Sequence, residues 1–388
     1  MNNRYLRATG MVVSVWCFFV FLSGIVRPAE DKIVIKTENG IPVVYNPKNP
    51  APPDGGPRAL ILRHELTIGQ DETDPNSMFS RLRSIQVDDR EDIYALDTKE
   101  TKIKVFDKSG KFLRSFGKKG QGPGEIDRPT RMEMTRDSRL ILADLGNNKL
   151  AFFGLDGNLV KELPTGKNWA LARLKLDSKG HIYAETRTFE ETKWTSELKR
   201  FGPDFRAATT LASFEEKRPD PLFIQAFSRV FSFQTRSDDL LVWTIAQGDK
   251  YEFAIYDGTG KIIRRFNRAY DPVKIPGIIK ERLTKEIMGD QGIPAEVKFH
   301  VPSHFPSLEY FIIDDQDRLY VRTYAFEEQG GERWLYHDVF DAVGLYIARF
   351  LLPERELVFQ VKKGKLYCLV QESEDGIPLI KRYSMTWK

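Results

Sequence analysis

Short apolar runs of strand length alternate with polar turn residues along most of this chain. Between Ile85 and Leu163 one pattern occurs twice: an aspartate, an aliphatic residue six positions later, a phenylalanine three positions further on, and then a glycine. The first copy starts at Asp97 and the second at Asp144, which is 47 residues further along the chain. A repeat of about 40–50 residues is typical of solenoids, propellers and arrays of small units.

The second copy shows what one repeat contains. It has four apolar runs, separated by turn residues such as the pairs Asn147-Asn148 and Asp156-Gly157, which tolerate a positive φ in tight turns. The runs lie at 131–135, 140–143, 150–153 and 159–163. Because four antiparallel strands form one blade of a β-propeller, the pattern predicts an all-β fold of this kind.

Aromatic residues mark the later copies of the repeat. The six anchors are Phe106, Phe153, Phe201, Tyr256, Phe340 and Tyr383. We therefore predict a six-bladed β-propeller over residues 59–388, with four-stranded antiparallel blades. The last repeat, Phe359–Lys388, supplies only three strands, and an open ring would leave unpaired sheet edges. The apolar run Leu60–Ile68 is expected to close the last blade as its outer strand.

One interval between repeats is too long. Tyr256 and Phe340 lie 84 residues apart, and part of the excess, 270–307, interrupts the strand pattern. Within this segment Gly277–Met288 has apolar residues at helical spacing. We expect a short helical insertion between blades four and five, which either covers the channel mouth, docks a partner or packs against a blade edge.

The N-terminal region differs from the rest of the chain. Residues 1–29 begin with a basic stretch and continue into the apolar run 11–26, which indicates a signal peptide or an uncleaved signal-anchor. Residues 30–58 hold a hairpin around Asn39-Gly40 and a proline-rich segment, which is either an extended stalk or a strap on the propeller. The expected location is extracytoplasmic: periplasmic, cell-surface or secreted.

The repeat pattern carries a family resemblance. Together with the paired asparagines after Asp144 and the glycine-rich run GKKGQGPGEIDRP, it resembles NHL-repeat propellers, in particular the exported bacterial six-bladed proteins of that group. The resemblance extends over about Leu60–Lys388 and is specific in the first two blades. It implies a funnel-shaped six-bladed propeller, but not one activity, because such propellers include lyases, lactonases and binding modules.

Four arginines stand at or near the starts of the predicted innermost strands, where these strands reach the mouth of the central channel. They are Arg83, Arg131, Arg173 and Arg229. Several guanidinium groups at one mouth would bind a carboxylate or a phosphate, because their planar set of donors matches these anions. The alternative is that they form salt bridges with neighbouring acids such as Glu133.

No set of catalytic residues is predicted. Of the five histidines only His300 and His304 lie close together, and Pro302 prevents a regular helix from placing both on one face. These two are therefore weak candidates for metal ligands. Four aspartates that follow the innermost strands are expected to serve turns, with scattered calcium ligands as the alternative. They are Asp88, Asp137, Asp177 and Asp314.

The charge balance also limits the function. The net charge of +4 is spread over 59 basic and 55 acidic residues without a long block of one sign, so we expect no nucleic-acid partner. The sequence favours an exported, non-enzymatic binding module for a protein, peptide or glycan, without a cofactor and with membrane contact only through the N-terminal segment. The alternative is a metal-dependent hydrolase or lyase, lactonase-like or amidating-lyase-like, which uses calcium or zinc at the central channel.

Overall fold

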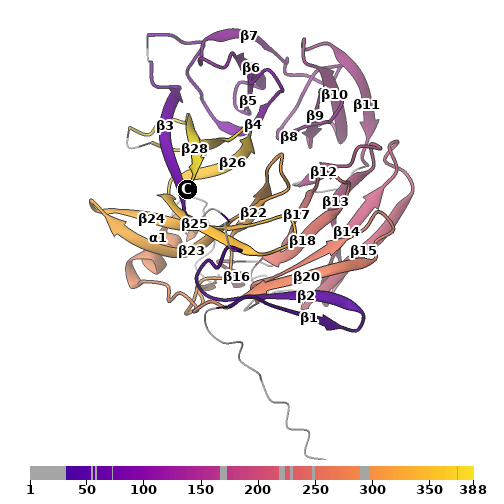
Figure 1. Ribbon diagram of the computed structural model, residues 1–388. Helices are drawn as coiled ribbons and strands as arrows, with labels where there is room; N and C mark the ends of the chain where they lie inside the picture. Colours follow the sequence, from indigo (N-terminus) through magenta and orange to yellow (C-terminus); the bar gives the residue numbers. More distant parts are fainter. Residues whose placement is uncertain are drawn as a thin grey trace, which may run out of the picture.

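Six β-sheets surround a common axis (Figure 1), which confirms the predicted fold class. The computed structural model describes residues 32–53, 56, 59–71, 73–166, 173–217, 223–227, 230–246, 250–288, 298–373 and 375–388. The predicted signal segment 1–29 and Arg229 lie outside the described residues. Among the described residues, no helix is long and apolar enough to cross a membrane.

Each blade is antiparallel from its innermost strand at the axis to its outermost strand at the rim. Blade one comprises β4 (Leu82–Val87), β5 (Ile93–Asp97), β6 (Lys102–Phe106) and β7 (Phe112–Phe116). Blade two comprises β8 (Pro129–Met134), β9 (Arg139–Asp144), β10 (Lys149–Gly154) and β11 (Leu159–Pro164). Blade three comprises β12 (Leu174–Leu176), β13 (Ile182–Phe189), β14 (Lys193–Phe201) and β15 (Ala208–Lys217).

The second half of the ring repeats this arrangement. Blade four comprises β17 (Val230–Thr235), β18 (Leu241–Ala246), β19 (Glu252–Tyr256) and β20 (Ile262–Arg268). Blade five comprises β22 (Tyr310–Ile313), β23 (Leu319–Gln329), β24 (Glu332–Phe340) and β25 (Tyr346–Pro353). Blade six comprises β26 (Glu356–Lys362), β27 (Lys365–Val370), β28 (Leu379–Trp387) and, from the other end of the chain, β3 (Leu60–Ile68).

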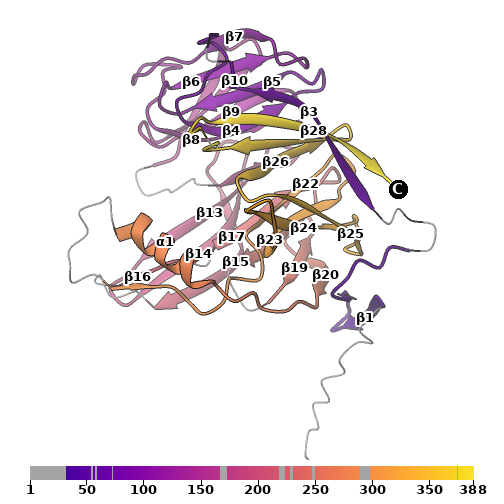
Figure 2. The same ribbon diagram turned by 90° about the vertical axis from the view of Figure 1, so that its left-hand side faces the viewer.

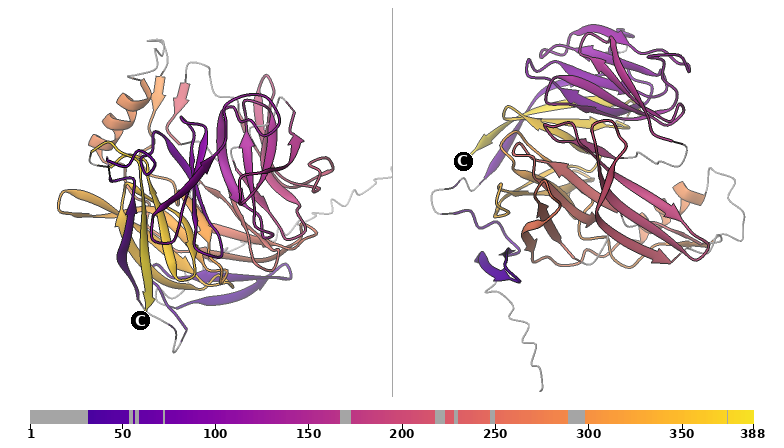
Figure 3. Two further views of the ribbon diagram at one scale, coloured as in Figure 1. Left: turned by 90° about the horizontal axis from the view of Figure 1, so that it is seen from above. Right: turned by 90° about the vertical axis from the view of Figure 1, so that its right-hand side faces the viewer.

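Strand β3 closes the ring as predicted. It pairs antiparallel with β28, with Ile68 opposite Ile380 at one end and Leu60 opposite Trp387 at the other. In Figure 3 the indigo strand lies beside the yellow C-terminal strand. Because the last blade takes its outer strand from the start of the domain, it gains a fourth strand and the two ends of the propeller are tied together.

An N-terminal hairpin extends blade four to six strands. Strands β1 (Val34–Glu38) and β2 (Ile41–Asn46) meet at the turn Asn39-Gly40, whose φ angles of 49° and 78° are both positive. Strand β2 then pairs parallel with β20 at the rim (Figure 1). The hairpin therefore covers an edge of blade four that would otherwise be open.

The chain after this hairpin lies against blade five. The Asn46 amide donates to the carbonyl of Gly344 at 2.8 Å, and its oxygen accepts a hydrogen bond from the N–H of Tyr346 at 2.8 Å. Further along, the N–H of Ala51 donates to the carbonyl of Tyr346 at 2.9 Å. The described part of this segment is thus a strap across blades four and five.

The predicted helix α1 (Gly277–Met288) lies between blades four and five, near the two short parallel strands β16 (Phe223–Gln225) and β21 (Lys298–His300) (Figure 2). Ile279 is buried on the helix and packs with Phe305, whose ring stacks on Tyr324 of β23 with centroids 4.7 Å apart. The insertion is therefore anchored by apolar contacts to the long hairpin of blade five.

The glycine of the repeat lies in the outer turn of blades one, two, four and five, where its positive φ favours glycine. The angles are 88° at Gly110, 91° at Gly157, 88° at Gly260 and 90° at Gly344. Blade three has Phe205 at this place, with a φ of 62°, which is strained for a bulky residue. The Phe205 ring packs on Phe201, with centroids 4.5 Å apart.

Asp338 of β24 holds a buried network together. Its carboxylate is fully buried and receives four donors at 2.6–2.9 Å. These are Tyr251 and Arg268 from blade four and Tyr346 and Arg349 from blade five. Arg268 also donates to the carbonyl of Lys48, which joins the strap to the same network. One carboxylate therefore connects two blades and the strap.

His337, the residue directly before Asp338 in β24, is buried on the other face of the strand. Its ring stacks on Phe350 with centroids 5.0 Å apart, and its Nε2 has no hydrogen-bond partner among the described residues. Burial and the nearby Arg322 hold the pKa of His337 well below its usual value. This histidine is therefore neutral in the folded protein at pH 7.

Replacing Asp338 should be strongly destabilising. We expect Asp338→Ala to lower the free energy of unfolding by about 3–5 kcal/mol, because the buried Arg268 and the half-buried Arg349 lose their shared counter-charge. Urea denaturation measures the loss. Asp271→Ala is the control, because Asp271 is 78% exposed in its ion pair with Lys48, and its effect should stay within about 1 kcal/mol. Equal losses in the two variants would contradict this assignment.

His337 should make the fold acid-sensitive. Its folded-state pKa is depressed, so its contribution to stability is present above the unfolded pKa of about 6.5 and is lost as the pH falls below it. We expect the urea midpoint to decline less between pH 7 and pH 5 in His337→Gln than in the wild type. His304→Gln, at an exposed histidine, should keep the wild-type slope. Identical slopes in all three proteins would rule out this role.

Candidate functional site

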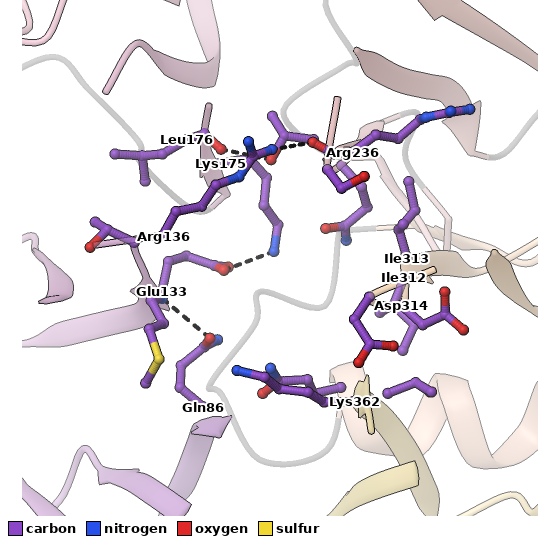
Figure 4. Close-up of a pocket in the computed structure, with 18 of the residues that line it drawn as sticks. Gln86, Glu133, Arg136, Lys175, Leu176, Arg236, Ile312, Ile313, Asp314 and Lys362 are labelled. Carbon is purple, nitrogen blue, oxygen red and sulfur yellow. Dashed lines mark hydrogen bonds and ion pairs between the residues drawn. The ribbon is translucent and has the colours of Figure 1, made fainter. Parts of the chain in front are cut away.

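The innermost strands surround a cavity of about 290 Å³ on the propeller axis. One residue of each innermost strand lines it at the same height: Gln86, Glu133, Lys175, Gln234, Ile312 and Gln360. Figure 4 shows Gln86, Glu133, Lys175 and Ile312 around this space. Five of these six side chains are polar, although the strands that carry them are otherwise packed in the core.

The three glutamines link neighbouring blades. The Gln86 amide donates to the carbonyl of Met132 in blade two at 3.2 Å, and that of Gln234 donates to the carbonyl of Phe311 in blade five at 3.0 Å. Gln360 accepts a hydrogen bond from the N–H of Val87 in blade one at 2.8 Å. Because innermost strands do not pair with one another, these side chains satisfy backbone groups that face the axis.

The charged members of the ring form a second kind of link. Glu133 of blade two pairs with Lys175 of blade three and with Arg131 of its own strand, each at 2.8 Å. The Glu133 side chain is only 7% exposed. Burial by itself would raise the pKa of Glu133, but the charges of Lys175 and Arg131 outweigh burial and lower it. Glu133 is therefore an ionised carboxylate between two cations.

A second cavity of about 210 Å³ adjoins the first, and Arg131 and Lys175 line both. Arg173 and Tyr310 also line this second cavity, which we call the axial pocket. It opens toward the disc face on which the innermost strands begin, here called the first face. The axial pocket thus lies where the sequence predicted a cluster of arginines.

Arg173 forms no ion pair among the described residues. Its Nη1 donates to the carbonyl of Phe231 at 2.8 Å, but no carboxylate of the described residues lies within 4.0 Å of its guanidinium group. Burial lowers the pKa of Arg173, and the nearby Arg131 adds to this shift while Glu185 opposes it. Because arginine keeps its proton in proteins, Arg173 remains an under-neutralised charge.

The structure brings two of the four predicted arginines together. Arg131 and Arg173 share the axial pocket, whereas Arg83 is exposed beside a bulge in β4 and lines neither cavity. The fourth, Arg229, is among the undescribed residues. The alternative prediction, a salt bridge with a neighbouring acid such as Glu133, holds for Arg131. Among the described residues, Arg173 forms no such salt bridge.

Positive charge is in excess in the axial pocket. Arg131, Arg173 and Lys175 face it, together with Glu133 at its border, and a further lining residue, Glu309, is paired with Arg322 at 2.7 Å. Tyr310 also lines the pocket, and its buried hydroxyl has no hydrogen-bond partner among the described residues. Among the described residues, the pocket therefore has more cationic side chains than carboxylates to pair with them.

Sequence reasoning missed Lys175, Tyr310 and the glutamines. Lys175 and Gln86 stand two positions before Asp177 and Asp88, each of which starts the turn after an innermost strand. A polar residue at this place in several otherwise apolar strands was the available signal. Tyr310 gave no such signal, because a tyrosine at the start of a strand is ordinarily a packing residue.

The aspartates after the innermost strands serve their turns. Asp88 accepts hydrogen bonds from the N–H groups of Arg90 and Asp92 at 2.8 and 2.9 Å, and Asp177 and Asp314 make the corresponding bonds in blades three and five. Asp137 accepts from Thr135 and pairs with Arg139. These carboxylate oxygens are occupied by local donors.

The two histidines proposed as weak metal candidates lie in the insertion before blade five. His300 ends β21, and the Nδ1 of His304 lies 2.9 Å from the hydroxyl of Ser303. Within the described part of the chain, no group of three or more histidine, cysteine, aspartate or glutamate side chains is arranged to hold a metal ion. The described geometry therefore gives these histidines no further ligands.

The blade ring and its axial pocket define the protein class as a six-bladed β-propeller. The chain belongs to the family DUF5128, described as 6-bladed beta-propeller, whose model matches residues 71–265, half of the sequence. No curated protein matches the sequence. The matched range includes blades one and two, blade three and most of blade four.

Two solved structures from Bacteroides are similar to this chain. A DUF4221 family member from Bacteroides vulgatus ATCC 8482 is 12% identical, with a TM-score of 0.51 over 85% of this chain and 99% of that chain. A protein from Bacteroides fragilis NCTC 9343, named as a candidate exported protein, is 12% identical, with a TM-score of 0.50 over 89% and 99%. At this identity the likeness shows the fold alone.

The pair Glu133–Lys175 should be energetically coupled. We expect Lys175→Met to lower the free energy of unfolding by about 3 kcal/mol, because Glu133 then keeps only one cation in a buried site. The double variant Glu133→Gln/Lys175→Met should recover part of this loss, since it removes the buried carboxylate and leaves only Arg131, whose side chain is 26% exposed. Urea denaturation of the wild type, both single variants and the double variant completes the cycle. Strictly additive losses would show that the two side chains are not coupled.

Proposed function

We propose that this protein is an extracytoplasmic, non-enzymatic binding propeller that takes a carboxylate or phosphate group of its ligand into the axial pocket. The observation that carries the proposal is the half-buried guanidinium group of Arg173, which forms no ion pair among the described residues and shares the pocket with Tyr310, whose buried hydroxyl has no hydrogen-bond partner there. An anion between them would accept both kinds of hydrogen bond. Such charge-assisted bonds are about twice as strong as bonds between neutral groups.

The surroundings of these donors favour an anion over a neutral ligand. Phe359 and Val358 form an apolar wall, and the Arg131 guanidinium lies over the Phe359 ring at 5.4 Å from its centroid. In a partly enclosed site, the attraction between a guanidinium group and an anion is screened less than at the open surface. Glu133 limits the net charge, so the site suits one small anionic group.

Export is supported by separate observations. The basic start and the apolar run 11–26 are typical of a secretory signal, and the similar Bacteroides fragilis protein is named as a candidate exported protein. The likeness to exported NHL-repeat propellers in the first two blades agrees with this location. We therefore place the binding site outside the cytoplasm, with any membrane contact made through the N-terminal segment.

Inorganic phosphate and succinate test the proposal directly. Either anion should raise the melting temperature of the wild-type protein, and at 100 times its Kd the stabilisation is about 2.7 kcal/mol. Arg173→Gln should abolish this increase. Tyr310→Phe should weaken it while leaving the anion-free stability unchanged or slightly higher, because it removes a hydroxyl that has no acceptor.

Arg83→Gln is the matched control, because it also removes an arginine near the start of an innermost strand but one that lies outside both cavities. It should keep the full anion-dependent increase. An increase that survives in Arg173→Gln, or no increase in the wild type with either anion, would overturn the proposed site.

A further inference from the structure

A polar groove runs along the first face between blades five and six. It consists of two adjoining cavities of about 730 and 450 Å³, which share Glu332, Pro353, Arg355 and Ser373 in their linings. The inner cavity begins beside helix α1 at Arg282, and the outer one ends beside strand β3 at His64. The cavity volumes lie in the range of about 300–1,000 Å³ that ligand sites occupy.

The groove adjoins the axial pocket. Leu357 lines both the inner cavity of the groove and the axial pocket, so the two cavities meet at this partly exposed residue. The backbone beneath it is fixed by Arg322, which donates to the carbonyl of Glu354 at 2.5 Å and to that of Glu356 at 2.7 Å. The segment Glu354–Leu357, here called the sill, therefore lies between the axial pocket and the groove with its backbone held in place.

Three arginines line the inner cavity of the groove. Arg282 and Arg333 both form ion pairs with Glu354, at 3.5 and 3.2 Å. The Nε and Nη1 atoms of Arg333 have no hydrogen-bond partner among the described residues, and burial lowers its pKa. Arg355 is exposed and, within the described part of the chain, has no carboxylate partner.

Acidic side chains stand among these arginines. Glu332 from the tip of the blade-five hairpin and Glu372 from the facing loop of blade six both line the inner cavity. The groove thus offers hydrogen-bond donors and acceptors, and charges of both signs, along its length. This arrangement matches a polypeptide, whose backbone alternates N–H and C=O groups and whose side chains carry either charge.

We infer that the axial pocket and the groove form one site for a peptide with a free C-terminal carboxylate. The carboxylate occupies the axial pocket at Arg173 and Tyr310, and the preceding residues cross the Leu357 sill into the groove toward Arg355. This inference rests on the proposed function and specifies its ligand. A peptide is favoured over an acidic glycan because the described rings that line the groove, His64 and Tyr383, stand only at its outer end.

A pooled library of acetylated pentapeptides tests the inference. One half carries free C-terminal carboxylates, and the other half has the same sequences with C-terminal amides. The full-length protein should retain peptides from the acid half, and their amide forms should bind at least tenfold more weakly, as expected when a charge-assisted bond is lost. Affinities of retained peptides are then measured by calorimetry.

Variants separate the two parts of the site. Arg173→Gln should weaken the retained peptides at least tenfold, and Arg355→Gln should weaken them about three- to tenfold. Arg83→Gln should change nothing. Arg355 is exposed, so its replacement leaves the fold intact, and melting curves without ligand confirm this for each variant.

The outcomes distinguish this inference from the proposed function. Stabilisation by phosphate or succinate that depends on Arg173, with no peptide retained, would overturn the peptide assignment and leave the proposed function standing. If retained peptides bind the Arg355→Gln variant as tightly as the wild type, the groove is not part of the site.

If oligogalacturonates bind and peptides do not, and if their affinity falls in Arg355→Gln, the ligand is an acidic glycan and the peptide assignment is wrong. Loss of both anion and peptide binding would overturn both.

Discussion

Innermost strands of six separate sheets meet around one axis without sharing backbone hydrogen bonds, and this constraint governs the channel. Each such strand presents an unpaired edge to the axis, and a buried unpaired amide or carbonyl is costly. Gln86, Gln234 and Gln360 meet part of this demand by bonding to the backbone of the next blade. The polar lining of the channel is thus first a structural requirement and only then a candidate binding surface.

The axial pocket begins where these structural links end. Glu133 is held by Lys175 and Arg131, and Glu309 by Arg322, so the carboxylates near the axis already have partners. Among the described residues, Arg173 donates to a backbone carbonyl but meets no carboxylate, and the hydroxyl of Tyr310 has no hydrogen-bond partner. What distinguishes the proposed binding residues is therefore an incomplete set of partners, because charge and position at the axis are shared with residues that only join blades.

Buried charge also holds the second half of the ring together. Asp338 connects blades four and five and, through Arg268, the N-terminal strap. Arg322 connects blade five with the start of blade six and fixes the sill between the axial pocket and the groove. Asp338 and Arg322 each have several partners. Replacing either residue would therefore disturb both the contacts between blades and the surface that these blades form.

The sequence by itself determined the number of blades, the closure by Leu60–Ile68 and the helix at Gly277–Met288, because hydrophobic periodicity and turn residues are local signals. It also placed Arg131 and Arg173 at equivalent positions. Only the tertiary structure decided that, among the described residues, Arg131 has an ion-pair partner and Arg173 has none, since this depends on how the side chains of neighbouring blades meet at the axis. The hairpin on blade four and the groove beside blade six likewise depend on contacts between segments far apart in the chain, for which local periodicity carries no signal.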